Sequence, residues 1–236
     1  MKSFAAAAFL LATLAEVAQG HYIFQYLTAN GAKGAQYQNI RKNTNNNSPV
    51  TVLTDTNLRC NVGGASGSST TTVSVAAGSS VSFTADQAVY HQGPVSFYMT
   101  KVSDAPAADG SSDWFKIKEI GPTFSGGQAK WDLSQTYSVN IPSCVAPGDY
   151  LLRIEQLGIH NPGSPPQFYI SCAQVKVTGG EGRGRSRRPL RSLGMLRLRI
   201  RGTLRTSTAQ TSRAMLFLDR RWRLAEEIAK SLVRTL

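Results

Sequence analysis

Residues 21–180 are predicted to form an all-β domain, a β-sandwich with long loops. Polar and apolar residues alternate in residues 71–75 and again in residues 81–83, as expected for strands with one buried face. Residues 150–154 and 168–170 are rich in the aromatic and branched side chains that favour strands. No amphipathic helix of convincing length is found in this part of the chain, and short strands separated by long loops are typical of a sandwich.

The expected loops are clusters of Gly, Ser, Asn, Asp and Ala at residues 43–48, 63–69 and 104–112. Residues 21–180 are about one domain in length, which is enough to bury a single substantial core.

Residues 1–20 have the layout of a secretory signal peptide. Lys2 gives a positive start, residues 4–14 are apolar, and the small residues Ala18 and Gly20 precede a cleavage point before His21. The alternative is a buried N-terminal helix. The apolar run is short for a membrane span, and no later segment is long and apolar enough for one. We therefore expect a secreted, extracellular protein.

The basic charge is confined to one part of the chain. The net charge is +12, but residues 21–180 contain 10 Lys and Arg against 9 Asp and Glu, whereas residues 181–236 contain 15 against 4. The nearly neutral domain argues against a specific nucleic-acid partner. The Gly- and Arg-rich residues 181–201 are expected to be disordered, and residues 214–232 have apolar residues near helical spacing. This tail is either an anchor for anionic polymers or membrane surfaces, or an aberrant sequence not selected with the domain.

Three histidines and three cysteines are the main candidates for site chemistry. In an oxidising compartment the cysteines Cys60, Cys144 and Cys172 can form one bridge within the chain and leave one thiol. A mature N-terminal His21 offers both its amine and its imidazole to one metal ion. A third nitrogen from another histidine completes a planar set that suits copper(II). The alternative is that His21 merely follows the cleavage point.

The other candidate side chains lie at expected strand ends and loops. His91 precedes Gly93 and Pro94, a turn signal, although a lone histidine in such a loop is more often an ordinary surface residue. Gln167 and Tyr169 share one face of a strand, while Cys172 points to the opposite face. Phe168 and Ile170 are expected in the core, and Tyr22, Tyr26 and Tyr37 are either core residues or stack on sugars.

The chain resembles the fungal lytic polysaccharide monooxygenases of auxiliary-activity family nine over residues 21–180. The resemblance rests on a mature-terminal His21 and on five motifs in a specific order and spacing. These motifs are Asn57-Leu58-Arg59-Cys60-Asn61, His91-Gln92-Gly93-Pro94, Trp114-Phe115-Lys116-Ile117, Pro147-Gly148-Asp149-Tyr150-Leu151-Leu152-Arg153, and the block from His160 to Gln174. It implies an immunoglobulin- or fibronectin-like β-sandwich.

The resemblance also implies the site. One copper ion is held by the amine and imidazole of His21 and the imidazole of His91, a histidine brace, with Tyr169 as the axial ligand. His160 and Gln167 match the residues that steer bound oxygen and supply a hydrogen bond or proton. Cys60 and Cys172 match the family's disulfide. The family's N-terminal histidine can also carry a ring methyl group in a fungal host.

The expected function is therefore oxidative cleavage of β-1,4-glucan, most simply cellulose, by hydrogen abstraction at C1 or C4. The co-substrate is dioxygen or hydrogen peroxide, an external donor supplies electrons, and the protein is expected to be a monomer. Asp149 and Glu155 are not placed as the carboxylate pair that hydrolysis requires. The alternative is a non-catalytic copper- or carbohydrate-binding protein on the same fold. The sequence decides neither C1 against C4 nor cellulose against hemicellulose.

Overall fold

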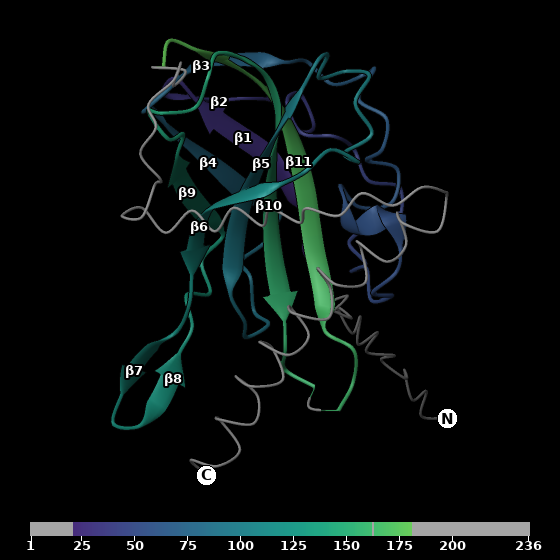
Figure 1. Cartoon of the computed structure of the whole chain (residues 1–236). Helices are drawn as coiled ribbons and strands as arrows, with labels where there is room; N and C mark the ends of the chain where they lie inside the picture. Colours follow the sequence, from purple (N-terminus) through teal and green to yellow (C-terminus); the bar gives the residue numbers. More distant parts are fainter. Residues whose placement is uncertain (1–20, 162, 181–236) are drawn as a thin grey trace, which may run out of the picture.

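The computed structural model describes residues 21–161 and 163–180, so the expected signal peptide and the basic tail lie outside the described residues. The described residues form two packed β-sheets and a small hairpin (Figure 1). The predicted all-β sandwich is thus confirmed. No helix among the described residues is long and apolar enough to cross a membrane.

The first sheet has the strand order β2-β1-β4-β9 and the second has the order β3-β11-β10-β5-β6. All pairs are antiparallel except β3 with β11, which is parallel. The bounds of the elements follow in chain order: β1 Phe24–Ala29, β2 Ala32–Lys33, the 3-10 turn η1 Thr56–Leu58, β3 Val73–Ala76, β4 Ser80–Ala85, β5 Val95–Val102, β6 Phe115–Ile120, β7 Thr123–Ser125, β8 Gln128–Lys130, β9 Thr136–Asn140, β10 Gly148–Gly158 and β11 Gln167–Thr178.

The core lies between the two sheets because the alternating strands turn their apolar sides inward. Phe83 and Val139 come from the first sheet, and Phe97, Leu152 and Val175 come from the second. The expected strands in residues 150–154 and 168–170 are confirmed as parts of β10 and β11. The expected strand at 71–75 is displaced, since β3 begins only at Val73.

Strands β10 and β11 pair along their whole length, from Gly148 opposite Val177 to Gly158 opposite Gln167. The connection between them, the start of β5 and the β7–β8 hairpin all lie at one end of the sandwich, the lower end in Figure 1. We call this the site end. It brings the residues around 91, 160 and 167 together although they are far apart in sequence.

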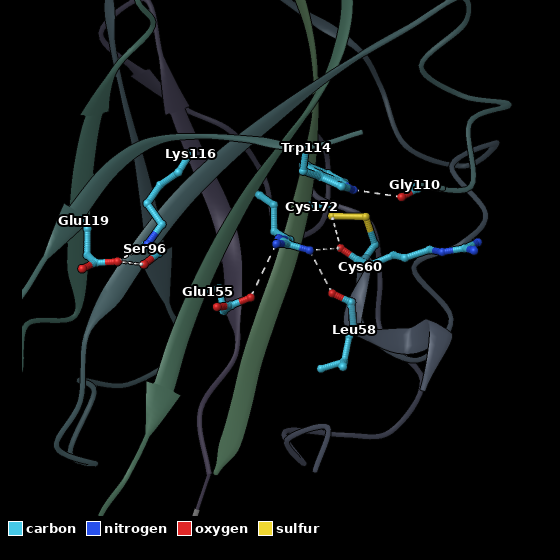
Figure 2. A network of polar contacts seen from close by, with 11 residues as sticks. Leu58, Cys60, Ser96, Gly110, Trp114, Lys116, Glu119, Glu155 and Cys172 are labelled. Carbon is cyan, nitrogen blue, oxygen red and sulfur yellow. Dashed lines mark hydrogen bonds and ion pairs between the residues drawn. A yellow bond between two sulfur atoms is a disulfide. The ribbon is translucent and has the colours of Figure 1, made fainter. Parts of the chain in front are cut away.

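The outer face of β10 is held by a buried polar network (Figure 2). The Arg153 guanidinium lies between the rings of Tyr98 and Trp114, at 4.4 and 4.7 Å from their centroids. Its Nη2 is 3.6 Å from Glu155 Oε2, and its Nη1 donates to the Leu58 carbonyl at 3.0 Å. Burial raises the pKa of Glu155 and lowers that of Arg153. The network ties the loop before Cys60 to β10.

Cys60 and Cys172 form a disulfide across 112 residues of sequence, next to this network (Figure 2). This is the pairing that the resemblance implied, and Cys144 is free and half-buried. As expected from the alternation of β11, Cys172 packs in a separate cluster with Cys60 and Ala105, whereas Tyr169 belongs to the main core. Phe168 and Ile170 are core residues, as expected.

Candidate metal centre at one end of the sandwich

His21 lies just before β1, and loop side chains hold its backbone. Its carbonyl accepts hydrogen bonds from Gln87 Nε2 at 2.6 Å and Asn47 Nδ2 at 3.3 Å. The Ile23 amide donates to Asp86 Oδ1 at 3.0 Å, and the Asn47 amide also donates to the Asp86 carboxylate. The half-buried His21 is therefore fixed to two loops through its own carbonyl and the residues that follow it.

His91 lies in the turn that enters β5, where the sequence signal placed it. The turn rests on the end of β10, because the Leu157 and Ile159 amides donate to the Pro94 and Gln92 carbonyls at 3.0 and 2.9 Å. Gly93 has a φ of +146°, and a Cβ there would lie 1.7 Å from the Leu157 carbonyl oxygen. Only glycine permits this approach, so the Gly-Pro pair fixes where His91 meets β10.

Gln167 and Tyr169 lie at the start of β11 and point to the same side, as predicted from their spacing. The Tyr169 hydroxyl donates to Gln167 Oε1 at 2.8 Å. Burial raises the pKa of Tyr169, so this side chain is a neutral phenol that can donate. The strand thus presents a fixed phenol and amide pair at the site end.

His160 follows β10 and stacks on His91. The two rings are nearly parallel, with an interplanar angle of 4° and a centroid distance of 3.8 Å. His160 Nε2 is 3.1 Å from Asn161 Nδ2, while its Nδ1 is buried and has no hydrogen-bond partner among the described residues. Gly158 lies directly beside both histidines, because a Cβ there would lie 3.4 Å from His91 Cβ and 3.5 Å from His160 Nδ1.

The structure brings all five candidate residues to one place. The ring centroids of His21 and His91 lie 6.1 and 5.6 Å from that of Tyr169. No group of three or more His, Cys, Asp or Glu side chains suited to a metal occurs within residues 21–161 and 163–180. A brace requires only two imidazoles and an amine, and this nitrogen-rich set with one phenol has the donor chemistry that suits copper. The residues present therefore fit a copper ion.

Several residues of the site were not predicted from the sequence. Gln156, fully buried on β10, accepts a hydrogen bond from the Tyr22 hydroxyl and donates to the His91 carbonyl. Tyr22 is fully buried and stacks on Tyr169 at 4.2 Å, so it is a core residue and does not reach a sugar. Strand β10 also contains Asp149, Arg153 and Glu155, so the sequence alone did not single out Gln156.

One large aromatic side chain is exposed next to His91, and another is exposed on the β7–β8 hairpin. Tyr90, next to His91, is 40% exposed, and Phe124 on the β7–β8 hairpin is 69% exposed. Figure 1 shows the hairpin projecting at the site end. The Tyr90 ring, 4.3 Å from that of His91, therefore gives the site an exposed aromatic neighbour.

With this fold and site in place, comparison with known proteins assigns the chain to a family. Residues 21–204 match Auxiliary Activity family 9 (formerly GH61), and the chain belongs to this family.

Similar relatives include AA9 family lytic polysaccharide monooxygenase E of Podospora anserina and AA9 family lytic polysaccharide monooxygenase A of Botryotinia fuckeliana. The first is 55% identical over 76% of this chain and 61% of that protein. The second is 54% identical over 69% of this chain and 52% of that protein. The chain thus spans less than two thirds of the length of these two relatives.

Two solved structures have the same fold. The crystal structure of HiLPMO9B superimposes with a TM-score of 0.61 and 32% identity, over 71% of this chain and 82% of that one. A cellulose-active polysaccharide monooxygenase from M. thermophila gives a TM-score of 0.58 and 30% identity, over 68% and 79%. Both agree with the sandwich described above.

Proposed function

We propose that this chain is a secreted, copper-dependent monooxygenase that cleaves β-1,4-glucan oxidatively. The observation that carries the proposal is the gathering of the His21 and His91 rings around Tyr169 at one end of the sandwich. Membership of a family whose relatives are named lytic polysaccharide monooxygenases supports it. The family match begins at His21, which supports removal of residues 1–20 before the site is complete.

In this proposal the amine and imidazole of His21 and the imidazole of His91 would hold one copper ion, with the Tyr169 phenol beside them. Bound copper would supply the redox chemistry, the activation of dioxygen or hydrogen peroxide for hydrogen abstraction from a sugar ring. The Tyr169 phenol, whose pKa is raised by burial, donates a hydrogen bond to Gln167 Oε1. That bond orients the Gln167 side chain and leaves its amide N–H groups as donors.

His160 is proposed to hold or move a proton at its Nδ1. That atom is buried without a partner among the described residues, and a buried polar atom of this kind calls for a ligand or a water. Its stacking on His91 holds the ring beside the proposed ligand. Groups around a metal's ligands tune the site as well as the ligands do.

The proposed substrate is a β-glucan such as cellulose, bound across the site end. Exposed Tyr90 and Phe124 offer the aromatic faces on which sugar rings can stack. One solved structure with this fold is described as cellulose-active, which supports this choice of substrate. Oxidation takes place at C1 or C4, and an external donor supplies the electrons.

The test compares the protein that begins at His21 with a variant that carries one extra glycine before it. The extension moves the amine away from the His21 imidazole. Copper(II) affinity, measured by calorimetry, should therefore fall by more than about 100-fold. That is the upper limit for losing a residue that only contacts a metal ligand, and here a ligand itself is lost. Mass spectrometry of cellulose treated with the copper-loaded protein and a reductant should detect oxidised oligosaccharides.

Equal copper affinity of the two forms would overturn the brace. Tight copper binding without oxidised products would instead favour the alternative, a non-catalytic copper-binding protein on the same fold.

A further inference from the structure

The side-chain amide of Gln156 connects the two segments that carry His21 and His91. Gln156 is fully buried near the end of the central strand β10, between Tyr169 on β11 and Val95 on β5. Its Oε1 accepts from the Tyr22 hydroxyl, and its Nε2 donates to the His91 carbonyl at 3.0 Å. One side chain thus contacts the residue after His21 and the backbone of His91 itself.

The hydrogen bonds fix the orientation of this amide. The His91 carbonyl can only accept, so the Gln156 NH₂ group must face it. The Gln156 oxygen then faces Tyr22 and requires a donor, which a protonated phenol supplies. A flipped amide would turn its oxygen toward the His91 carbonyl and lose that bond inside the core, so the bridge has one stable arrangement.

Each end of the bridge is rigid. Tyr22 is held by its stacking on Tyr169 at 4.2 Å and by an edge contact with Tyr90 at 5.3 Å. The turn after His91 is fixed to β10 through the Ile159 and Leu157 amides. The Gln156 amide therefore acts between two ordered segments.

We propose that Gln156 is a positioning residue that sets the spacing between the segment starting at His21 and the turn carrying His91. The inference rests on the proposed function, in which these two residues hold copper. Gln156 does not contact the metal or the substrate. It acts through the backbone of His91 and through Tyr22.

The test replaces Gln156 by methionine, which has similar volume but lacks both hydrogen-bonding groups. In the metal-free protein, amide hydrogen exchange at Ile159 should accelerate, because that amide is bonded to the turn that Gln156 holds. Copper(II) affinity should fall by about tenfold, as it does when other residues that support a metal ligand are replaced. The EPR spectrum of the copper(II)-loaded protein should also change.

Thr100→Val is the matched control. Thr100 is fully buried at the far end of β5, and its hydroxyl donates to the Asp113 carbonyl at 2.9 Å. The control therefore also removes a buried hydrogen bond to a backbone carbonyl in the same sheet. It should lower thermal stability while leaving the copper affinity, the EPR spectrum and the exchange of Ile159 unchanged. If Gln156→Met does not fold, Tyr22→Phe removes one bond of the bridge and is expected to produce the same spectral change.

The outcomes separate this inference from the proposed function. A wild-type protein that binds no copper overturns the proposed function and this inference with it. A wild-type protein that binds copper, with unchanged affinity, spectrum and Ile159 exchange in Gln156→Met, overturns the inference alone. The same changes in Thr100→Val would overturn it as well, because they would reflect general loss of stability.

Discussion

The rings of His91 and His160 lie face to face at 3.8 Å, yet the two residues are assigned different roles. His91 belongs to the turn that Gln156 and β10 hold in place, and its ring approaches Tyr169 at 5.6 Å. His160 lies beyond the end of β10, stacked on the His91 ring, and its Nδ1 is buried without a partner among the described residues. Under the proposed function, His91 is the ligand and His160 is the neighbour stacked on it.

Exchanging each histidine for alanine should separate these roles. His91→Ala should lower copper(II) affinity by about 100-fold or more and abolish the release of oxidised sugars. Residues that only contact a metal ligand cost about 10- to 100-fold when they are removed. His160→Ala should stay within that range. Both variants should keep a melting temperature close to that of the wild type, because both imidazoles are only half-buried. Calorimetry and thermal unfolding measure these effects. Equal copper affinity in wild type and His91→Ala would contradict the assignment.

At the residue level, local patterns predicted part of the site. The two-residue spacing of Gln167 and Tyr169 placed both on one face, and the Gly-Pro pair placed His91 in a turn. The bridge from Tyr22 to Gln156 was not predictable, because it joins residues 134 positions apart. Which distant strands become neighbours depends on the packing of the sheets, and no local periodicity contains that information.

At the level of elements, the site is assembled from the ends of three neighbouring strands. His91 precedes β5, His160 follows β10, and Gln167 begins β11, and these three strands are adjacent in the order β11-β10-β5. Parts of the long strands β10 and β11, residues 150–154 and 168–170, were predicted from their strong β-forming residues. The short β7–β8 hairpin was not, because its residues are largely exposed and show no buried stripe.

The disulfide links β11 to the loop after η1 and should contribute strongly to stability. Replacing both Cys60 and Cys172 by alanine opens a loop of 112 residues, which in the chain-entropy model costs about 4 to 5 kcal/mol of unfolding free energy. Chemical denaturation measures the loss. Cys144→Ala is the control and should change stability by about 0.5 kcal/mol or less, as substitutions outside the core do. A comparable loss in the control, or peptide mapping that finds Cys144 cross-linked, would contradict this pairing.

At the scale of the whole molecule, the sequence patterns predicted the architecture better than they predicted the site. Alternating strands, loop clusters and the lack of helices predicted a sandwich, since each strand must bury one face. The sandwich leaves its strand ends open, and the loops there carry the candidate residues, while the buried Arg153 and Glu155 pair stiffens the outer face of β10. The Glu155 carboxyl is buried in that pair, so it is not exposed for hydrolytic chemistry.

The tyrosine-rich core gives the whole fold a distinct response to alkaline pH. Burial raises the pKa of Tyr137 and of Tyr150, whose hydroxyls donate to the Asp132 and Ala146 carbonyls. Above about pH 10 the unfolded chain releases these phenolic protons while the folded protein retains them. The unfolded state then binds fewer protons, so stability falls as pH rises, by up to about 1.4 kcal/mol per pH unit for each such phenol.

Urea denaturation at a series of pH values from 8 to 11 tests this expectation. Tyr137→Phe should be less stable than wild type at pH 8, because the Asp132 carbonyl loses its donor. The difference should shrink toward pH 11, because the variant no longer has the Tyr137 proton that the unfolded wild type releases. The value at pH 8 serves as the internal control, so the change in the difference isolates the titration from the lost hydrogen bond. A constant difference across the range would mean that the Tyr137 phenol titrates alike in the folded and unfolded states, which its burial in the core makes physically unfavourable.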